Sequence, residues 1–163
     1  MHGKAQVGNQ RFMWLARIWT QEFWKKLLKT NEVVSSMDGA CFMAKHENSS
    51  RDFWHIDQSL NTKGWQTWQG VLALTTNTKS SLYLYPKTHL LHETYASTIK
   101  DNKLRSQKFH KINKSYLENL PIKPIIVPIP AGCIALFDSR IFHQNKMDCE
   151  ERTVLYISML PKS

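Results

Sequence analysis

The chain has 163 residues, of which 42% are hydrophobic and 11% aromatic, which excludes a disordered polypeptide and predicts one domain over residues 1–163. Its formal net charge of +9 favours anionic partners such as acidic small molecules or nucleic acid. No stretch approaches ~18 consecutive apolar residues, so we expect no membrane span.

The cysteines and the first residues bear on the compartment. Cys41, Cys133 and Cys149 are odd in number and form no CxxC pair, so we expect free thiols in a reducing environment. Residues 1–6 lack the apolar run of a secretory signal. Together these features predict a cytoplasmic or nuclear location.

The first predicted element is an amphipathic helix over residues 11–30. Its apolar residues recur at spacings of three and four and therefore share one face. They are Phe12, Leu15, Trp19, Phe23 and Leu27. We expect this face to pack on the outside of a sheet. The alternative is a basic helix that lies on a membrane, because Arg17 and three lysines lie largely off the stripe.

After residue 31 the sequence predicts short β-strands. They cover residues 41–45, 53–58, 65–75, 82–85, 125–127, 134–137 and 154–160. Gly64 and Gly132 mark turns between strands, and Pro86 ends the fourth strand. Many short strands with flanking helices indicate an all-β sandwich or barrel rather than alternating βαβ units.

A basic segment interrupts the strands at residues 100–123, with seven lysine or arginine residues against two acidic ones. We expect a solvated surface loop, or else a flap that attracts an anionic substrate to a neighbouring site. A nucleic-acid-binding module is a further alternative, in which this segment contacts phosphates and Trp54, Trp65 and Trp68 stack on bases.

Four residues have the spacing of a mononuclear iron site with a bound 2-oxo acid. His55 and Asp57 lie on one predicted strand, where alternation directs both side chains to the same face. With the distant His143 they supply two imidazoles and one carboxylate, which leave further metal positions open. Arg152 offers a planar fork for a carboxylate.

These segments resemble the phytanoyl-CoA dioxygenase branch of the Fe(II)/2-oxoglutarate oxygenases. Residues 54–58, Trp-His-Ile-Asp-Gln, are similar to the family's first ligand strand. Residues 82–89 are similar to its strand ending in a Pro-Gly-Ser-His turn, although Lys87 replaces the glycine. Residues 131–145 and 152–156 resemble the strands of the distal ligand and of the cofactor carboxylate.

The resemblance implies a double-stranded β-helix core (a cupin-like jelly roll) over residues 41–161, with the N-terminal helix packed on the sheet. It implies that His55, Asp57 and His143 bind Fe(II), that Arg152 and Asn145 hold 2-oxoglutarate, and that Lys45 contacts it. The implied reaction uses molecular oxygen to hydroxylate an unidentified substrate and converts 2-oxoglutarate to succinate.

A non-catalytic function is the alternative. The chain is short for this family, and related sequences occur in large DNA viruses, so a jelly roll with a vestigial metal site in virion assembly also fits. Retention of Arg152 argues against it, because a purely structural role needs no clamp for a 2-oxo acid.

Overall fold

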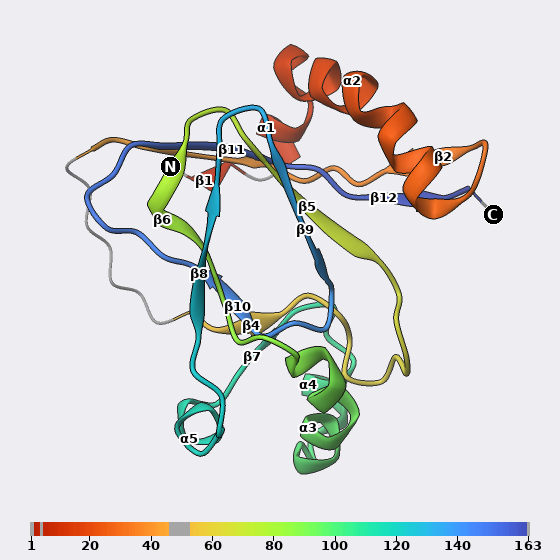
Figure 1. The fold of residues 1–163 in the computed structure, drawn as a ribbon. Helices are drawn as coiled ribbons and strands as arrows, with labels where there is room; N and C mark the ends of the chain where they lie inside the picture. The colour runs from red at the N-terminus through yellow and green to blue at the C-terminus, as the bar shows by residue number, and fades with distance from the viewer. Residues whose placement is uncertain (1, 4, 46–52, 163) are drawn as a thin grey trace.

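The computed structural model describes residues 2–3, 5–45 and 53–162. It consists mostly of antiparallel sheets with a few helices, an arrangement consistent with a jelly-roll-like fold (Figure 1). The helices are α1 (Ala5–Gly8), α2 (Arg11–Leu28), α3 (His92–Thr98), α4 (Asn102–Arg105) and α5 (Lys114–Glu118), and a 3-10 turn, η1 (Thr88–Leu91), precedes α3. None of the helices in the described ranges has both the length and the apolar character that crossing a bilayer requires.

Two five-stranded antiparallel sheets form the body of the molecule. The first has the order β1 (His2–Gly3), β3 (Ala40–Met43), β11 (Arg152–Tyr156), β5 (Trp68–Ala73), β9 (Ile134–Asp138). The second has the order β7 (His110–Lys111), β4 (His55–Ile56), β10 (His143–Asn145), β6 (Asn77–Leu84), β8 (Ile125–Ile129). A short pair, β12 (Met159–Pro161) with β2 (Val33–Ser35), lies under α2.

Three apolar clusters hold these layers together. The central cluster joins the inner faces of the two sheets through residues such as Val71, Leu82 and Val154. A second cluster packs α2 on the outer face of the first sheet, and a third packs α3 and α5 on the outer face of the second. Because side chains alternate along a strand, each sheet can bury one set of residues on each face.

The predicted strands are confirmed in position, with changes in length. Each of the seven overlaps an observed strand, and β6 begins five residues earlier than predicted. The last predicted strand divides into β11 and β12. Residues 100–123 lie largely at the surface, as expected. The expectation of a loop is wrong, because the segment contains α4, β7 and α5.

The predicted N-terminal helix is confirmed as α2, but the expected packing face is wrong. Trp19 is 73% exposed and Leu15 57%, whereas Met13, Arg17 and Trp24 are buried. Arg17 fixes this rotation, since its Nη1 donates to the carbonyl of Gly8 at 2.6 Å and its Nη2 to that of Asp38 at 3.3 Å. An amphipathic period does not reveal which of two apolar stripes packs inward.

Gly70 on β5 lies close to Trp24 of α2 and to the backbone of Ile157. A Cβ at this position would lie 2.3 Å from the carbonyl oxygen of Ile157 and 2.9 Å from Trp24 Cζ2. We therefore predict that Gly70→Ala lowers the free energy of unfolding in urea by about 3 kcal/mol through overpacking. Gly64→Ala is the control, with open space around its Cβ but a φ of +69°, and should cost about 1 kcal/mol. Equal losses in the two variants would contradict the close approach.

Candidate metal centre

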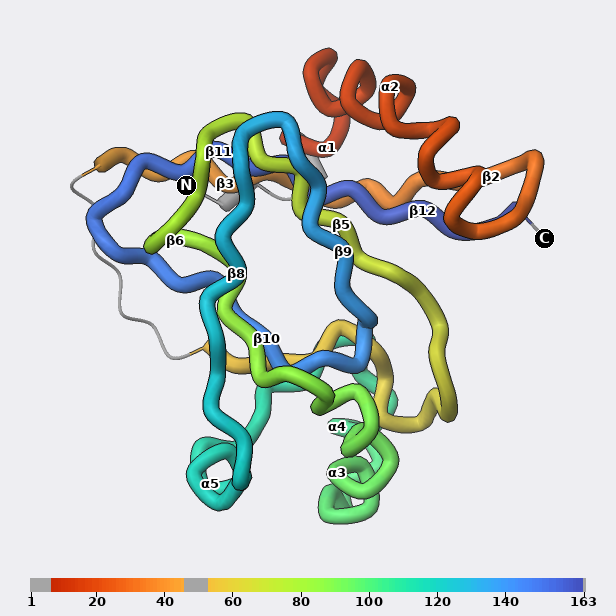
Figure 2. Tube along the Cα trace, viewed as in Figure 1, coloured from red at the N-terminus to blue at the C-terminus, as the bar shows by residue number. Residues whose placement is uncertain are grey.

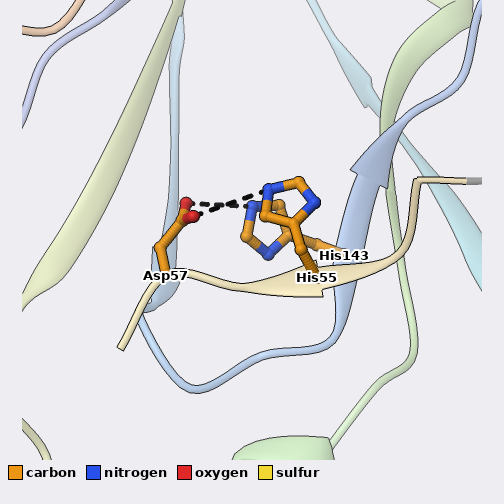
Figure 3. Close-up of side chains that lie close together, drawn as sticks. All are labelled: His55, Asp57 and His143. Carbon is orange, nitrogen blue, oxygen red and sulfur yellow. Dashed lines mark ion pairs between the residues drawn. The ribbon is translucent and has the colours of Figure 1, made fainter. Parts of the chain in front are cut away.

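His55, Asp57 and His143 meet at the inner face of the second sheet (Figure 3). β4 and β10 are antiparallel neighbours, and His143 lies directly opposite His55 in the ladder. Asp57 is the first residue after β4, and its side chain lies on the same side as that of His55. Its two carboxylate oxygens lie 3.6 Å from His55 Nε2 and 3.4 Å from His143 Nε2. The three ligand atoms all lie within 4.8 Å of one another.

Backbone contacts set the orientation of both imidazoles. His55 Nδ1 lies 2.7 Å from the carbonyl oxygen of Phe53, and His143 Nδ1 lies 2.9 Å from that of Ile141. A carbonyl can only accept, so in each neutral ring the proton is on Nδ1. Nε2 of each ring therefore faces the Asp57 carboxylate, as a donor when the ring is charged and with its lone pair when the ring is neutral. In the neutral form, a bound cation would accept the lone pair and offset the charge of the carboxylate.

The protonation states also suit a metal. Burial, and then the nearby charge of His143, lowers the pKa of His55 to about 4. Burial alone would raise the pKa of Asp57, but hydrogen bonding with His143, the charges of both imidazoles and a hydrogen bond from Gln69 together hold it below its ordinary value. At neutral pH, His55 is therefore neutral and Asp57 ionised, which is the state that binds a divalent metal.

Aromatic rings line the site. The ring of Phe137 lies 4.6 Å from that of His143, and the rings of Phe53 and Phe109 lie 5.2 Å and 4.9 Å from that of His55. Phe109 belongs to the basic segment 100–123, whose β7 pairs with β4. The segment thus lies beside the candidate site, as the flap interpretation requires, while its attraction of an anionic substrate stays a prediction.

Arg152 lies on the opposite sheet and is linked to the triad through Asn145. Its guanidinium is fully buried, and Nη2 donates to Asn145 Oδ1 at 2.9 Å. Asn145 is two residues beyond His143 on β10, a separation of roughly 7 Å along a strand. Within the described ranges, Arg152 Nε and Nη1 have no hydrogen-bond partner and no acidic side chain pairs with the guanidinium. The buried cation is thus left with free donors, which fit a carboxylate.

Two polar residues of the site were missed by sequence reasoning. Gln69 donates from Nε2 to Asp57 Oδ2 at 2.7 Å, and the hydroxyl oxygen of Tyr156 accepts a hydrogen bond from Asn145 Nδ2 at 3.0 Å. Tyr156 lies four residues after Arg152 on β11, so strand alternation could have placed both on one face. No comparable pattern marked Gln69, because its partner lies on the other sheet.

Lys45 and Trp54, two further residues with predicted roles, lie outside the triad. Lys45 is exposed, two residues after the end of β3, and its contact with a cofactor stays a prediction. Trp54 is buried in the cluster under α3 and α5, where it cannot stack on a base. In the part of the chain that the structure describes, the triad is the only group of three histidine, cysteine or acidic residues close enough to hold a metal.

Comparison with solved structures shows proteins of similar fold. EvdMO1 aligns with a TM-score of 0.61 at 17% identity over 96% of this chain, and AviO1 from Streptomyces viridochromogenes Tue57 with 0.59 at 16% over 94%. The epimerase SnoN, in complex with Fe3+, alpha ketoglutarate and nogalamycin RO, aligns with 0.55 at 13% over 90%. The chain spans 34%, 63% and 58% of those chains, respectively.

No protein-family model matches the chain, and no curated protein matches it. The phytanoyl-CoA dioxygenase branch and a viral source therefore gain no support from sequence comparison. The similar structures establish the fold, and one of them is an epimerase bound to iron and alpha ketoglutarate.

The hydrogen bond from Gln69 gives a prediction for metal affinity. Gln69→Leu keeps much of the side-chain volume but removes the donor that orients Asp57, so affinity for Co²⁺ or Fe(II) should fall about 10-fold to 100-fold. Gln66→Leu, at an exposed position near the start of β5, is the control. Titration of the apo protein measures the effect, and unchanged affinity in Gln69→Leu would show that Asp57 is oriented without it.

Proposed function

We propose that the protein is an Fe(II)/2-oxoglutarate-dependent dioxygenase with a double-stranded β-helix core over residues 41–161, of the phytanoyl-CoA dioxygenase type. One observation carries the proposal: a buried Arg152 with free donors is joined through Asn145 to the strand of the metal triad. A structural metal site would need the triad alone. A site for a 2-oxo acid needs both the triad and a cation at a short distance.

His55, Asp57 and His143 would hold the iron, and their single-sided arrangement leaves its other positions free. The bound iron and 2-oxoglutarate supply the oxidising chemistry that hydroxylates a C–H bond while 2-oxoglutarate is converted to succinate. Arg152 would bind the distal carboxylate, and Asn145 would hold the guanidinium in place. The rings of Phe53, Phe109 and Phe137 would restrict water around the iron.

The substrate would enter beside the basic segment. The side chain of Asp57 is 28% exposed, compared with 7% for His143, so the open side of the triad is near Asp57. Because residues 100–123 are strongly basic and reach the ligand strand through β7, we infer a small anionic substrate.

Formation of succinate tests the proposal. The purified protein is incubated with Fe(II), ascorbate, oxygen and 2-oxoglutarate, with mixtures of small anionic metabolites as co-substrates, and succinate is quantified by NMR. The wild-type protein should form succinate and His143→Ala should not. If the wild type forms no more succinate than His143→Ala, the proposed activity is wrong. If the wild type does form succinate, analysis of the co-substrate's product would distinguish hydroxylation from an epimerisation of the kind named for SnoN.

A further inference from the structure

Helix α2 presents a broad apolar face to solvent. It lies on the outside of the first sheet, at the opposite end of the molecule from α3, α4 and α5 (Figure 2). Six large apolar side chains of this helix are between 39% and 73% exposed: Phe12, Trp14, Leu15, Ile18, Trp19 and Phe23. Phe42 on β3 extends the face, with its ring 6.0 Å from that of Phe12.

This exposed face is not used by the core. The opposite side of α2 already buries Met13, Ala16 and Trp24 against the first sheet and β12. Single exposed apolar residues are common on soluble proteins, but a contiguous aromatic patch marks a contact surface. Because the patch lies along one convex helix and forms no groove for a peptide, it is better suited to contact a flat surface.

Basic residues accompany the patch. Arg11, Lys26 and Lys29 are exposed. Lys26 lies seven residues after Trp19 and eleven after Leu15, and at 3.6 residues per turn these three share one line along the helix. Arg11 and Lys29 similarly align with Ile18. Glu22, the single acidic residue of α2, is exposed on the same side and pairs with Lys25 at 2.8 Å. Arg11, Lys26 and Lys29 therefore leave this side of the helix with a net positive charge.

We propose that α2 docks the protein on an anionic lipid surface, with Trp19, Leu15 and Ile18 inserted at the headgroup boundary and Arg11, Lys26 and Lys29 contacting phosphates. Tryptophan and lysine or arginine are the residues that interfacial helices place in these roles. A second copy of the chain is the less suitable occupant. Each copy carries a formal charge of +9, and the cations bordering one patch would face those of the other.

Vesicle co-sedimentation of the full chain tests the proposal. The probes are vesicles of phosphatidylcholine alone and of phosphatidylcholine with phosphatidylserine. We expect binding to the anionic vesicles only, and weakening at high salt. Trp19→Ser should reduce the affinity about tenfold through lost apolar contact. Lys26→Glu should reduce it by a similar factor, about tenfold.

Matched variants lie at the far end of the molecule. Leu90→Ser removes an apolar side chain that is 69% exposed on η1, and Lys103→Glu reverses an exposed charge on α4; neither should change vesicle binding. Sedimentation velocity should show a monomer for the wild type. The proposal is overturned if anionic vesicles do not bind, if all four variants bind equally, or if a wild-type dimer is dissociated by Trp19→Ser. The last result would assign the face to a second copy.

Discussion

Asp57→Ala should abolish stoichiometric Fe(II) binding, with affinity reduced by more than about a hundredfold. Asp57 is the only carboxylate of the triad, and its two oxygens lie against both histidine Nε2 atoms. Its removal leaves two imidazoles and no anionic ligand, which cannot offset the cost of desolvating a divalent cation. The fold should survive, because the Asp57 side chain is 28% exposed and lies outside the three apolar clusters.

Anaerobic titration of the apo protein with Fe(II), or with Co²⁺ as a spectroscopic substitute, measures this effect. Asp148→Ala removes an exposed carboxylate and should bind metal like the wild type. Circular dichroism checks that both variants are folded. Stoichiometric metal in folded Asp57→Ala would show that the triad is not the metal site.

Arg152→Met should leave metal binding intact and reduce the affinity for 2-oxoglutarate by more than about a hundredfold, because charge-assisted hydrogen bonds to a buried carboxylate are lost. The same change should not destabilise the cofactor-free protein. Arg152 is fully buried, with two nitrogens unpaired, and replacing an unpaired buried charge by an apolar side chain is neutral or stabilising.

Two measurements separate this prediction from a general loss of structure. Isothermal titration of the metal-loaded protein with 2-oxoglutarate gives the affinity, and thermal unfolding without ligand gives the stability. Arg105→Met, at a peripheral arginine whose Nε donates to Asn61, is the control and should bind normally. Arg152→Met that binds 2-oxoglutarate as tightly as the wild type would mean that the carboxylate clamp lies elsewhere.

The closeness of His55 and Asp57, the first two proposed metal ligands, was predictable because strand alternation is a local rule. His55 and Asp57 are two residues apart, so an extended backbone alone brings them to one face. The direct pairing of His143 with His55 depends on the order β4-β10-β6 in the sheet, which no local pattern contains. The hydrogen bonds from Arg152 to Asn145 and from Gln69 to Asp57 likewise cross between elements that only the fold brings together.

The errors have physical causes of the same kind. The rotation of α2 is set by the contacts of Arg17 and by the closeness of Trp24 to Gly70, and helical periodicity is blind to both. The short helices of the basic segment did leave a sequence signal. Asp101 and Asn113 cap α4 and α5 by accepting backbone N–H groups, and such N-cap residues before a polar run indicate a helix start.

In the proposed enzyme, iron and 2-oxoglutarate bind together between the triad and Arg152. The most direct measurement is anaerobic addition of 2-oxoglutarate to the Fe(II)-loaded protein while the visible metal-to-ligand charge-transfer band is followed. The wild type should develop the band. Arg152→Met should need a far higher 2-oxoglutarate concentration for the same band intensity, and His143→Ala should lack the band. A wild-type protein that holds Fe(II) but gives no band with saturating 2-oxoglutarate would contradict the account, since the 2-oxo acid would then not chelate the metal.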